Sequence, residues 1–222
     1  MAAPIAHIFL AMQMLAGPFD GLFNEIEFIV GTSFPDIRYL KVISRDETHF
    51  CNVTLDDIVQ EKDSFKAGML FHSFVDEQRE AYILAHKFYS KIPSFRFVTQ
   101  SLKFAEDEIL RTLFDSSEYS SYFDEILEQE KAYPINIKHI QTWHRFLGEY
   151  CSGAYSCREL IMKYFDIMEP HAWLIKKYLF MWLYVSKMEQ VVSYITKNKW
   201  AKKAILDFYL HFVDRHASSL KK

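Results

Sequence analysis

The stretch Phe71-His72-Ser73-Phe74-Val75-Asp76-Glu77 lies in the middle of a long segment, residues 65–89, whose pattern predicts a helix. His72 and Asp76 are four residues apart, so a helix places both side chains on one face, one turn above the other. An imidazole and a carboxylate arranged in this way are suitable ligands for a first-row metal ion. The pair alone is a weak indication, because His and Asp at this spacing also occur on ordinary helices.

Two earlier residues strengthen the metal hypothesis. His7 lies in an apolar segment, residues 4–16, that predicts a buried first helix, where the alternative is a core imidazole bonded to a backbone carbonyl. Asp36 follows directly after Pro35 and precedes a short helix predicted over residues 37–43. An Asp at that place is typical of a helix cap, but a carboxylate on a proline-stiffened turn also suits a metal ligand or a general base.

A third candidate, His49, follows the charged loop formed by residues 44–48. Its alternative role is that of an ordinary surface histidine. Beyond it, Thr54 and Asp57 have the spacing of a capping box, which predicts a short helix over residues 55–61. Asp63 or Ser64 is then expected to cap the helix that carries His72 and Asp76.

The remaining pattern predicts an all-α chain. No strong alternation of period two is present, and proline, glycine or asparagine separates most of the apolar segments. We expect a single domain, residues 1–222, of roughly nine or ten helices, with a metal-site half at about 1–92 and a helical second half at about 93–222. The other predicted helices cover residues 19–30, 98–114, 117–131, 135–151, 156–168, 171–196 and 199–217.

One polar set in the second half also falls on a single helical face. Asp207, His211 and Asp214 are spaced four and three residues apart within the last predicted helix. The pattern favours the solvated face of an amphipathic helix, and a second metal site is the alternative.

Composition narrows the classes of partner. The formal net charge is −3 and half of the residues are hydrophobic, so no general basic field favours binding to nucleic acid. The three cysteines show no metal-binding or disulfide spacing, which indicates reduced thiols and a cytoplasmic protein. The most apolar late segment, residues 173–194, is interrupted by lysines and a glutamate, so we expect no transmembrane segment.

The order of these residues resembles that of the zinc-dependent phospholipase C and P1-type nuclease superfamily. The similar features are Ala6-His7-Ile8, Phe34-Pro35-Asp36-Ile37, His49-Phe50, and Phe65-Lys66-Ala67-Gly68 leading to His72-x-x-x-Asp76, all within about residues 1–90. The resemblance implies an all-α phospholipase C-like fold with zinc ions that hydrolyse phosphodiester bonds.

Carried over by position, the resemblance implies two zinc sites. Asp36, His49, His72 and Asp76 would bind one ion, and His7 would share Asp76 in binding a second. The family's third zinc needs a further His shortly after the Asp of the pair. Position 82 is tyrosine, so one or two ions are expected.

The implied activity is a metal-dependent hydrolase of phosphate esters, with a phospholipid head group preferred over nucleic acid. Asp36 would orient the metal-activated water or accept its proton. Glu77 and Glu80 are expected to fix the second nitrogens of the imidazole ligands. The alternative is a non-catalytic helical interaction protein that keeps a relic metal site.

Overall fold

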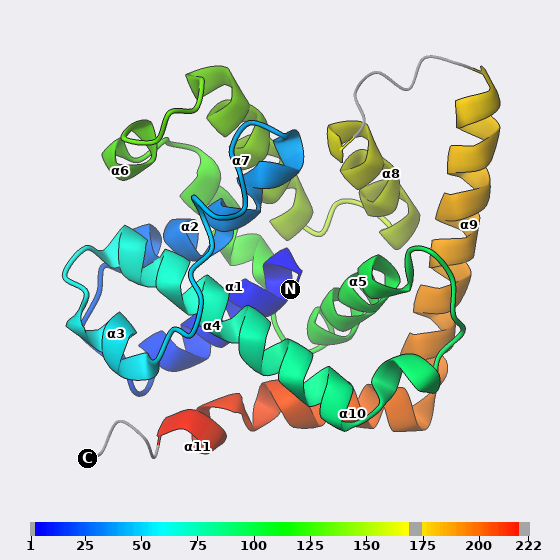
Figure 1. Cartoon of the computed structure of the whole chain (residues 1–222), viewed down its shortest axis with the longest axis horizontal. Helices are drawn as coiled ribbons and strands as arrows, with labels where there is room; N and C mark the ends of the chain where they lie inside the picture. Colours follow the sequence, from blue (N-terminus) through cyan, green and yellow to red (C-terminus); the bar gives the residue numbers. More distant parts are fainter. Residues whose placement is uncertain (1–2, 169–174, 218–222) are drawn as a thin grey trace.

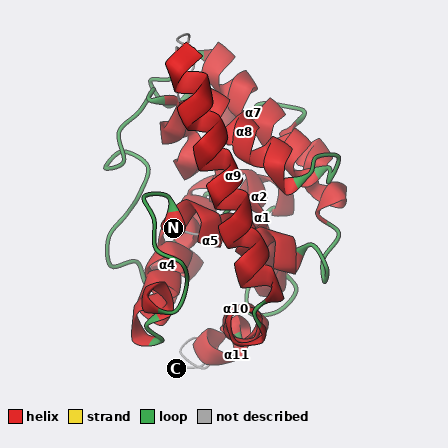
Figure 2. Ribbon diagram, turned by 90° about the vertical axis from the view of Figure 1, so that its right-hand side faces the viewer, coloured by secondary structure: helices red, strands yellow, loops and turns green. Residues whose placement is uncertain are grey.

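The computed structural model describes residues 3–168 and 175–217, and within them every regular element is a helix, as predicted. Figures 1 and 2 show helices and loops only. In chain order the elements are α1 (Pro4–Leu15), α2 (Glu25–Ser33), the 3-10 helix η1 (Phe34–Leu40), α3 (Leu55–Gln60), α4 (Ser64–Ala85), η2 (Phe88–Ser90), α5 (Val98–Leu110), η3 (Ser116–Phe123), α6 (Glu128–Lys131), α7 (Ile137–Cys151), α8 (Cys157–Met168), α9 (Ile175–Lys197), α10 (Lys199–Leu210) and α11 (Phe212–Ala217).

Helix α4 lies at the centre of the first half and packs against α1, α2 and α3 (Figure 1). It crosses α2 so closely that backbone meets backbone at Gly31 and Gly68. A Cβ atom on Gly31 would lie 2.0 Å from the Phe65 carbonyl oxygen, and one on Gly68 would lie 2.2 Å from the Phe28 carbonyl oxygen. Only glycine permits this approach, which brings the end of α2 against the face of α4 that carries His72.

Helix α1 is apolar on nearly every side because it runs through the interior of the molecule. Its first turn has no side-chain cap of its own. Instead, the buried carboxylate of Asp107 on α5 accepts hydrogen bonds from the backbone N–H groups of Ile5 and Ala6, at 3.2 and 2.9 Å. A distant carboxylate therefore satisfies N–H groups that a helix terminus leaves open, and it fixes the position of α1.

The second half continues the same core. Buried apolar side chains from most of the helices between α1 and α10, and Phe212 at the start of α11, form one hydrophobic cluster. Helix α9 runs along one side of the molecule against α5 (Figure 2). Trp143 is part of this core and is 2% exposed, whereas Trp182 on α9 is 55% exposed.

Several predicted boundaries are wrong, each for a local reason. The helix expected over 19–30 begins only at Glu25, because Gly21 takes a positive φ of 69° and Asn24 caps the later start. The long helix around His72 ends at Ala85, and Lys87 takes a left-handed conformation. The short helix expected over 37–43 is η1, which starts three residues earlier.

Two other predicted helices are each divided. The segment 117–131 forms η3 and α6, and the segment 199–217 forms α10 and α11, which are separated at His211. The division at His211 turns Phe212 into the core against Phe71. The first residues of the helix expected over 171–196 lie outside the described residues.

None of the helices that the structure describes combines the length and the apolar character needed to cross a bilayer.

Candidate metal centre

The five residues selected from the sequence, His7, Asp36, His49, His72 and Asp76, come together in the structure. All five are buried, with at most 8% of each residue exposed. They form two overlapping groups of ligand-type atoms, His7 with His72 and Asp76, and Asp36 with His49 and His72. Their assignment as metal ligands stays a prediction, because proximity alone does not show that an ion binds.

The end of α2 determines the orientation of the His72 ring. His72 Nδ1 lies 2.8 Å from the carbonyl oxygen of Thr32, which is in the last turn of α2. Carbonyls at a helix C-terminus lack intrahelical partners, so this one is free to accept the Nδ1–H. With the proton on Nδ1, the lone pair of Nε2 is directed towards the other ligands.

The loop that carries His49 is fastened to α4 at two points. The backbone N–H of Phe50 donates to Ser73 Oγ and that of Asn52 donates to Glu77 Oε1, both at 3.0 Å. These bonds hold His49 opposite His72, with their Nε2 atoms 3.2 Å apart. His49 is therefore a buried member of the cluster, and its alternative role as a surface residue is wrong.

The hydroxyl of Thr48 lies next to the other nitrogen of His49. Thr48 Oγ1 is 3.0 Å from His49 Nδ1 and also lies 3.4 Å from the carbonyl oxygens of Ser44 and Arg45. When the hydroxyl donates to a carbonyl, it accepts the Nδ1–H of His49 and leaves Nε2 unprotonated.

Glu77 and Glu80 do not orient these imidazoles, so that expectation is wrong. Glu77 anchors the backbone of Asn52, and Glu80 accepts a hydrogen bond from the Tyr89 hydroxyl at 3.2 Å. The orienting groups are the Thr32 carbonyl and the Thr48 hydroxyl. Thr48 is next to His49 in the sequence, whereas the role of Thr32 depends on the crossing of α2 and α4 and has no local signal.

His7 reaches the cluster from α1 and stacks on the ring of His72, with centroids 4.0 Å apart. Its Nε2 lies 3.4 Å from Asp76 Oδ1, and neither ring nitrogen has a hydrogen-bond partner among the described residues. The expected alternative, a bond to a backbone carbonyl, is therefore absent from the described structure. A buried imidazole with two unsatisfied nitrogens is uncommon in proteins and suits a residue that binds an ion.

Asp36 lies in the first turn of η1 and does not cap it. Its Oδ1 lies 3.9 Å from His49 Nε2 and 3.5 Å from Nη2 of Arg38. Burial opposes ionisation, but the nearby Lys103 ammonium and Arg38 guanidinium outweigh it and lower the pKa of Asp36 below its usual value. The carboxylate is therefore ionised at neutral pH.

The protonation states are those that metal binding requires. Burial lowers the pKa of His49 to about 3 and that of His72 to about 4, and it also lowers the pKa of His7. Burial alone would raise the pKa of Asp76, but its contacts with His72 and His7 keep the pKa well below its usual value. At pH 7 the imidazoles are neutral and the carboxylates are charged, so each is available as a ligand.

The spacing of three donor atoms is close to that of ligands around a tetrahedral ion. Zinc bonds of about 2.0–2.1 Å place tetrahedral ligands about 3.3–3.4 Å apart. His49 Nε2 and His72 Nε2 are 3.2 Å apart, and Asp76 Oδ2 lies 3.6 Å from His72 Nε2 and 3.9 Å from His49 Nε2. Asp36 Oδ1, which lies 3.9 Å from His49 Nε2, is the candidate for a fourth ligand. The other oxygen of Asp76 faces His7, so a second ion there would have fewer protein ligands and more open positions.

The other polar sets do not form a comparable centre in the described residues. His211 Nδ1 lies 3.6 Å from Asp214 Oδ2 at the exposed surface, and Asp207 pairs with Arg215. Tyr82 donates its hydroxyl hydrogen bond to Asp207. This result agrees with a solvated face and leaves the described chain without a third group of ligands.

No family model matches the chain, and no curated protein or solved structure matches it either.

Proposed function

We propose that the chain is a zinc-dependent hydrolase of phosphate esters. His49, His72, Asp36 and Asp76 would hold one ion, and His7 with Asp76 would hold a second. Bound zinc supplies a hydroxide at neutral pH by lowering the pKa of coordinated water, and it offsets charge on a phosphoryl group. The proposal takes zinc over other metals because neutral imidazoles and carboxylates at tetrahedral spacing suit it well.

A single observation supports this proposal most strongly. The Nε2 atoms of His49 and His72 lie 3.2 Å apart in a buried site, and each ring has its Nδ1 at a hydrogen-bond partner. If both Nδ1 atoms are protonated, two lone pairs face each other. These two lone pairs repel each other, and the low pKa values of the two imidazoles disfavour a proton between them. A metal cation that accepts both lone pairs relieves the repulsion.

The surrounding residues have separate tasks in this proposal. A carboxylate with a lowered pKa is a weak proton acceptor, so Asp36 would act chiefly as a ligand and orient the attacking water. The Thr32 carbonyl and the Thr48 hydroxyl would hold the two imidazoles in the ligating tautomer. The buried setting strengthens every charge interaction with the substrate.

The substrate class rests on the resemblance to the phospholipase C and P1-type nuclease superfamily and on the net charge. That resemblance implies a phosphodiester, and the absence of a basic excess favours a phospholipid head group over nucleic acid.

The test is hydrolysis of p-nitrophenyl phosphate and bis(p-nitrophenyl) phosphate by zinc-loaded protein. We expect release of p-nitrophenol that a chelator abolishes and added zinc restores. His72→Ala should reduce the rate to background, whereas His139→Ala, which removes an exposed imidazole on α7, should leave it unchanged. If the protein takes up zinc but hydrolyses neither ester, this proposal is wrong, and the alternative is a non-catalytic interaction protein with a relic metal site.

A further inference from the structure

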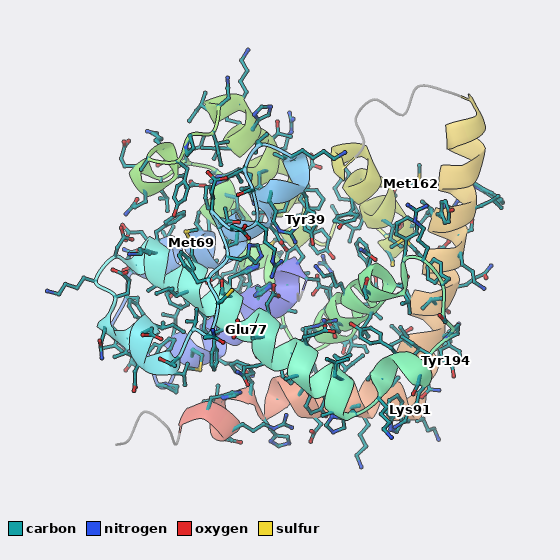
Figure 3. The ribbon with its side chains drawn as sticks, in the orientation of Figure 1. Tyr39, Met69, Glu77, Lys91, Met162 and Tyr194 are labelled. Carbon is teal, nitrogen blue, oxygen red and sulfur yellow. The ribbon has the colours of Figure 1, made fainter. Side chains whose placement is uncertain are left out.

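A small recess lies beside the metal centre. Asp36 lines this recess together with Ala3 and Pro4 at the start of α1. Tyr39, which is labelled in Figure 3, also lines it. The recess has a volume of about 30 Å³, enough for about two water molecules. Most of its wall is aromatic and comes from Phe104, Trp143, Phe146, Tyr150 and Tyr164. A group that enters it must therefore be small.

Lys103 on α5 brings a positive charge to this apolar recess. Its Nζ donates a hydrogen bond to the Tyr39 hydroxyl at 3.1 Å, and none of the described ion pairs includes it. An ammonium group has three N–H donors, so two further donors are available. Lys103 and the candidate ligand Asp36 line the same recess, so this charge lies beside the metal centre.

We propose that Lys103 and this recess bind an unesterified phosphoryl oxygen, which makes the substrate of the metal centre a phosphate monoester. The inference rests on the proposed function. When the ester bond of a monoester breaks, the three oxygens that stay on phosphorus all lack a substituent, whereas in a diester one of them carries a second organic group. A diester still keeps two oxygens without a substituent, so an oxygen of either ester fits the recess by size. The preference for a monoester therefore rests on charge.

Charge favours the monoester. A monoester has close to two negative charges at neutral pH, and a diester has one. Arg38 also lies over the Tyr39 ring, with its guanidinium carbon 4.4 Å from the ring centroid, and Lys103 Nζ is 5.5 Å from the same centroid. Two cations therefore border this side of the centre. An additional cation has a larger effect on the more highly charged ligand. The recess therefore favours a monoester over the diester that the family resemblance implies.

The test compares two probes by titration calorimetry with zinc-loaded protein, inorganic phosphate for the monoester charge and dimethyl phosphate for the diester. We expect wild type to bind phosphate at least tenfold more tightly than dimethyl phosphate. Lys103→Met should weaken phosphate binding by about tenfold or more, the usual effect of losing a hydrogen bond to a charged group. Lys103→Arg should recover part of that loss.

Zinc content and melting temperature are measured for every variant, and Lys138→Met, at an exposed position on α7, is the matched control. The comparison is made between proteins that hold zinc and fold like wild type. If wild type then binds both probes equally, or if Lys103→Met leaves the phosphate affinity unchanged, the monoester inference is wrong and the proposed function stands. If wild type takes up no zinc, the proposed function is wrong and the inference is lost with it.

Discussion

Replacing Gly68 by alanine tests how strongly the metal centre depends on the crossing of α2 and α4. The added Cβ would lie 2.2 Å from the Phe28 carbonyl oxygen and 2.7 Å from the Thr32 nitrogen, whereas ordinary contacts begin at 3.4 Å. Both obstructing atoms belong to the backbone, so the two helices must separate by about 1 Å because no side chain can move aside. Separation moves the Thr32 carbonyl away from His72 Nδ1.

The expected loss of stability follows from three contributions. Overpacking against backbone costs about 3 kcal/mol, and loss of the His72–Thr32 hydrogen bond adds about 1 kcal/mol. The better helix propensity of alanine returns about 1 kcal/mol. The net loss of about 3 kcal/mol corresponds to a fall in melting temperature of roughly 6–12 °C for a chain of this size. Because the imidazole also loses its orienting partner, zinc affinity should fall by about 10- to 100-fold.

Thermal unfolding followed by circular dichroism measures the first effect, and competition with a zinc chelator measures the second. Gly148→Ala on α7 is the matched control, because its Cβ would meet Ser120 at an ordinary 3.4 Å. The control should melt at the wild-type temperature or a few degrees above it. If Gly68→Ala melts at or above the wild-type temperature and binds zinc equally well, the described dependence on the crossing is wrong.

Three further predictions follow from the same contacts. Thr48→Val removes the hydroxyl beside His49 Nδ1 and should weaken zinc binding by about 10- to 100-fold in a chelator competition, and an unchanged affinity would refute the orienting role. Glu106→Gln leaves the buried guanidinium of Arg79 with only the exposed Glu80 as a charged partner, at 3.7 Å. It should lower the unfolding free energy in urea by about 3–5 kcal/mol, whereas a loss below 1 kcal/mol would contradict this. Burial raises the pKa of Asp107 to about 7, so the folded state holds the carboxyl proton more tightly than the unfolded chain does. The resulting contribution to the unfolding free energy is complete below about pH 4 and is lost as the pH rises through 7. The unfolding free energy of wild type minus that of Asp107→Asn should therefore fall by about 3 kcal/mol from pH 4 to pH 7, and a difference independent of pH would contradict the assignment.

Local signals predicted the parts of the fold that local chemistry controls. The Thr54–Asp57 capping box marks the start of α3, and Asp63 caps α4 as one of the two expected residues. The apolar character of residues 4–16 identified α1 as a buried helix. Each of the two caps depends on a side chain within one turn of the backbone groups that it satisfies.

Boundaries set by tertiary packing were not predictable in this way. The break at His211 lets Phe212 enter the core, although the sequence around it continues a helical pattern. The segment 117–131 likewise follows a helical pattern yet divides between Phe123 and Glu128. There Glu130 is fully buried and pairs with His144 of α7 at 2.7 Å. A single sequence does not show which distant partner a residue of this kind will meet.

The candidate site shows the same division. Residue type and order were enough to select five side chains that the structure brings together. The Thr48 hydroxyl is next to His49 in the sequence, but the Thr32 carbonyl and Lys103 in the recess reach the site only through the packing of α2 on α4 and of α5 on α1. A backbone carbonyl such as that of Thr32 has no residue-type signal at all.

The measurement that tests the central claim most directly is the zinc content of purified protein, by elemental analysis, for wild type and for the His72→Ala/Asp76→Ala double variant. We predict one or two zinc ions per wild-type chain and none in the variant. Wild type should also melt at a higher temperature when zinc is added, and the variant should not. If both proteins are free of zinc, and if added zinc changes the melting temperature of wild type no more than that of the variant, the buried His and Asp cluster is not a metal centre.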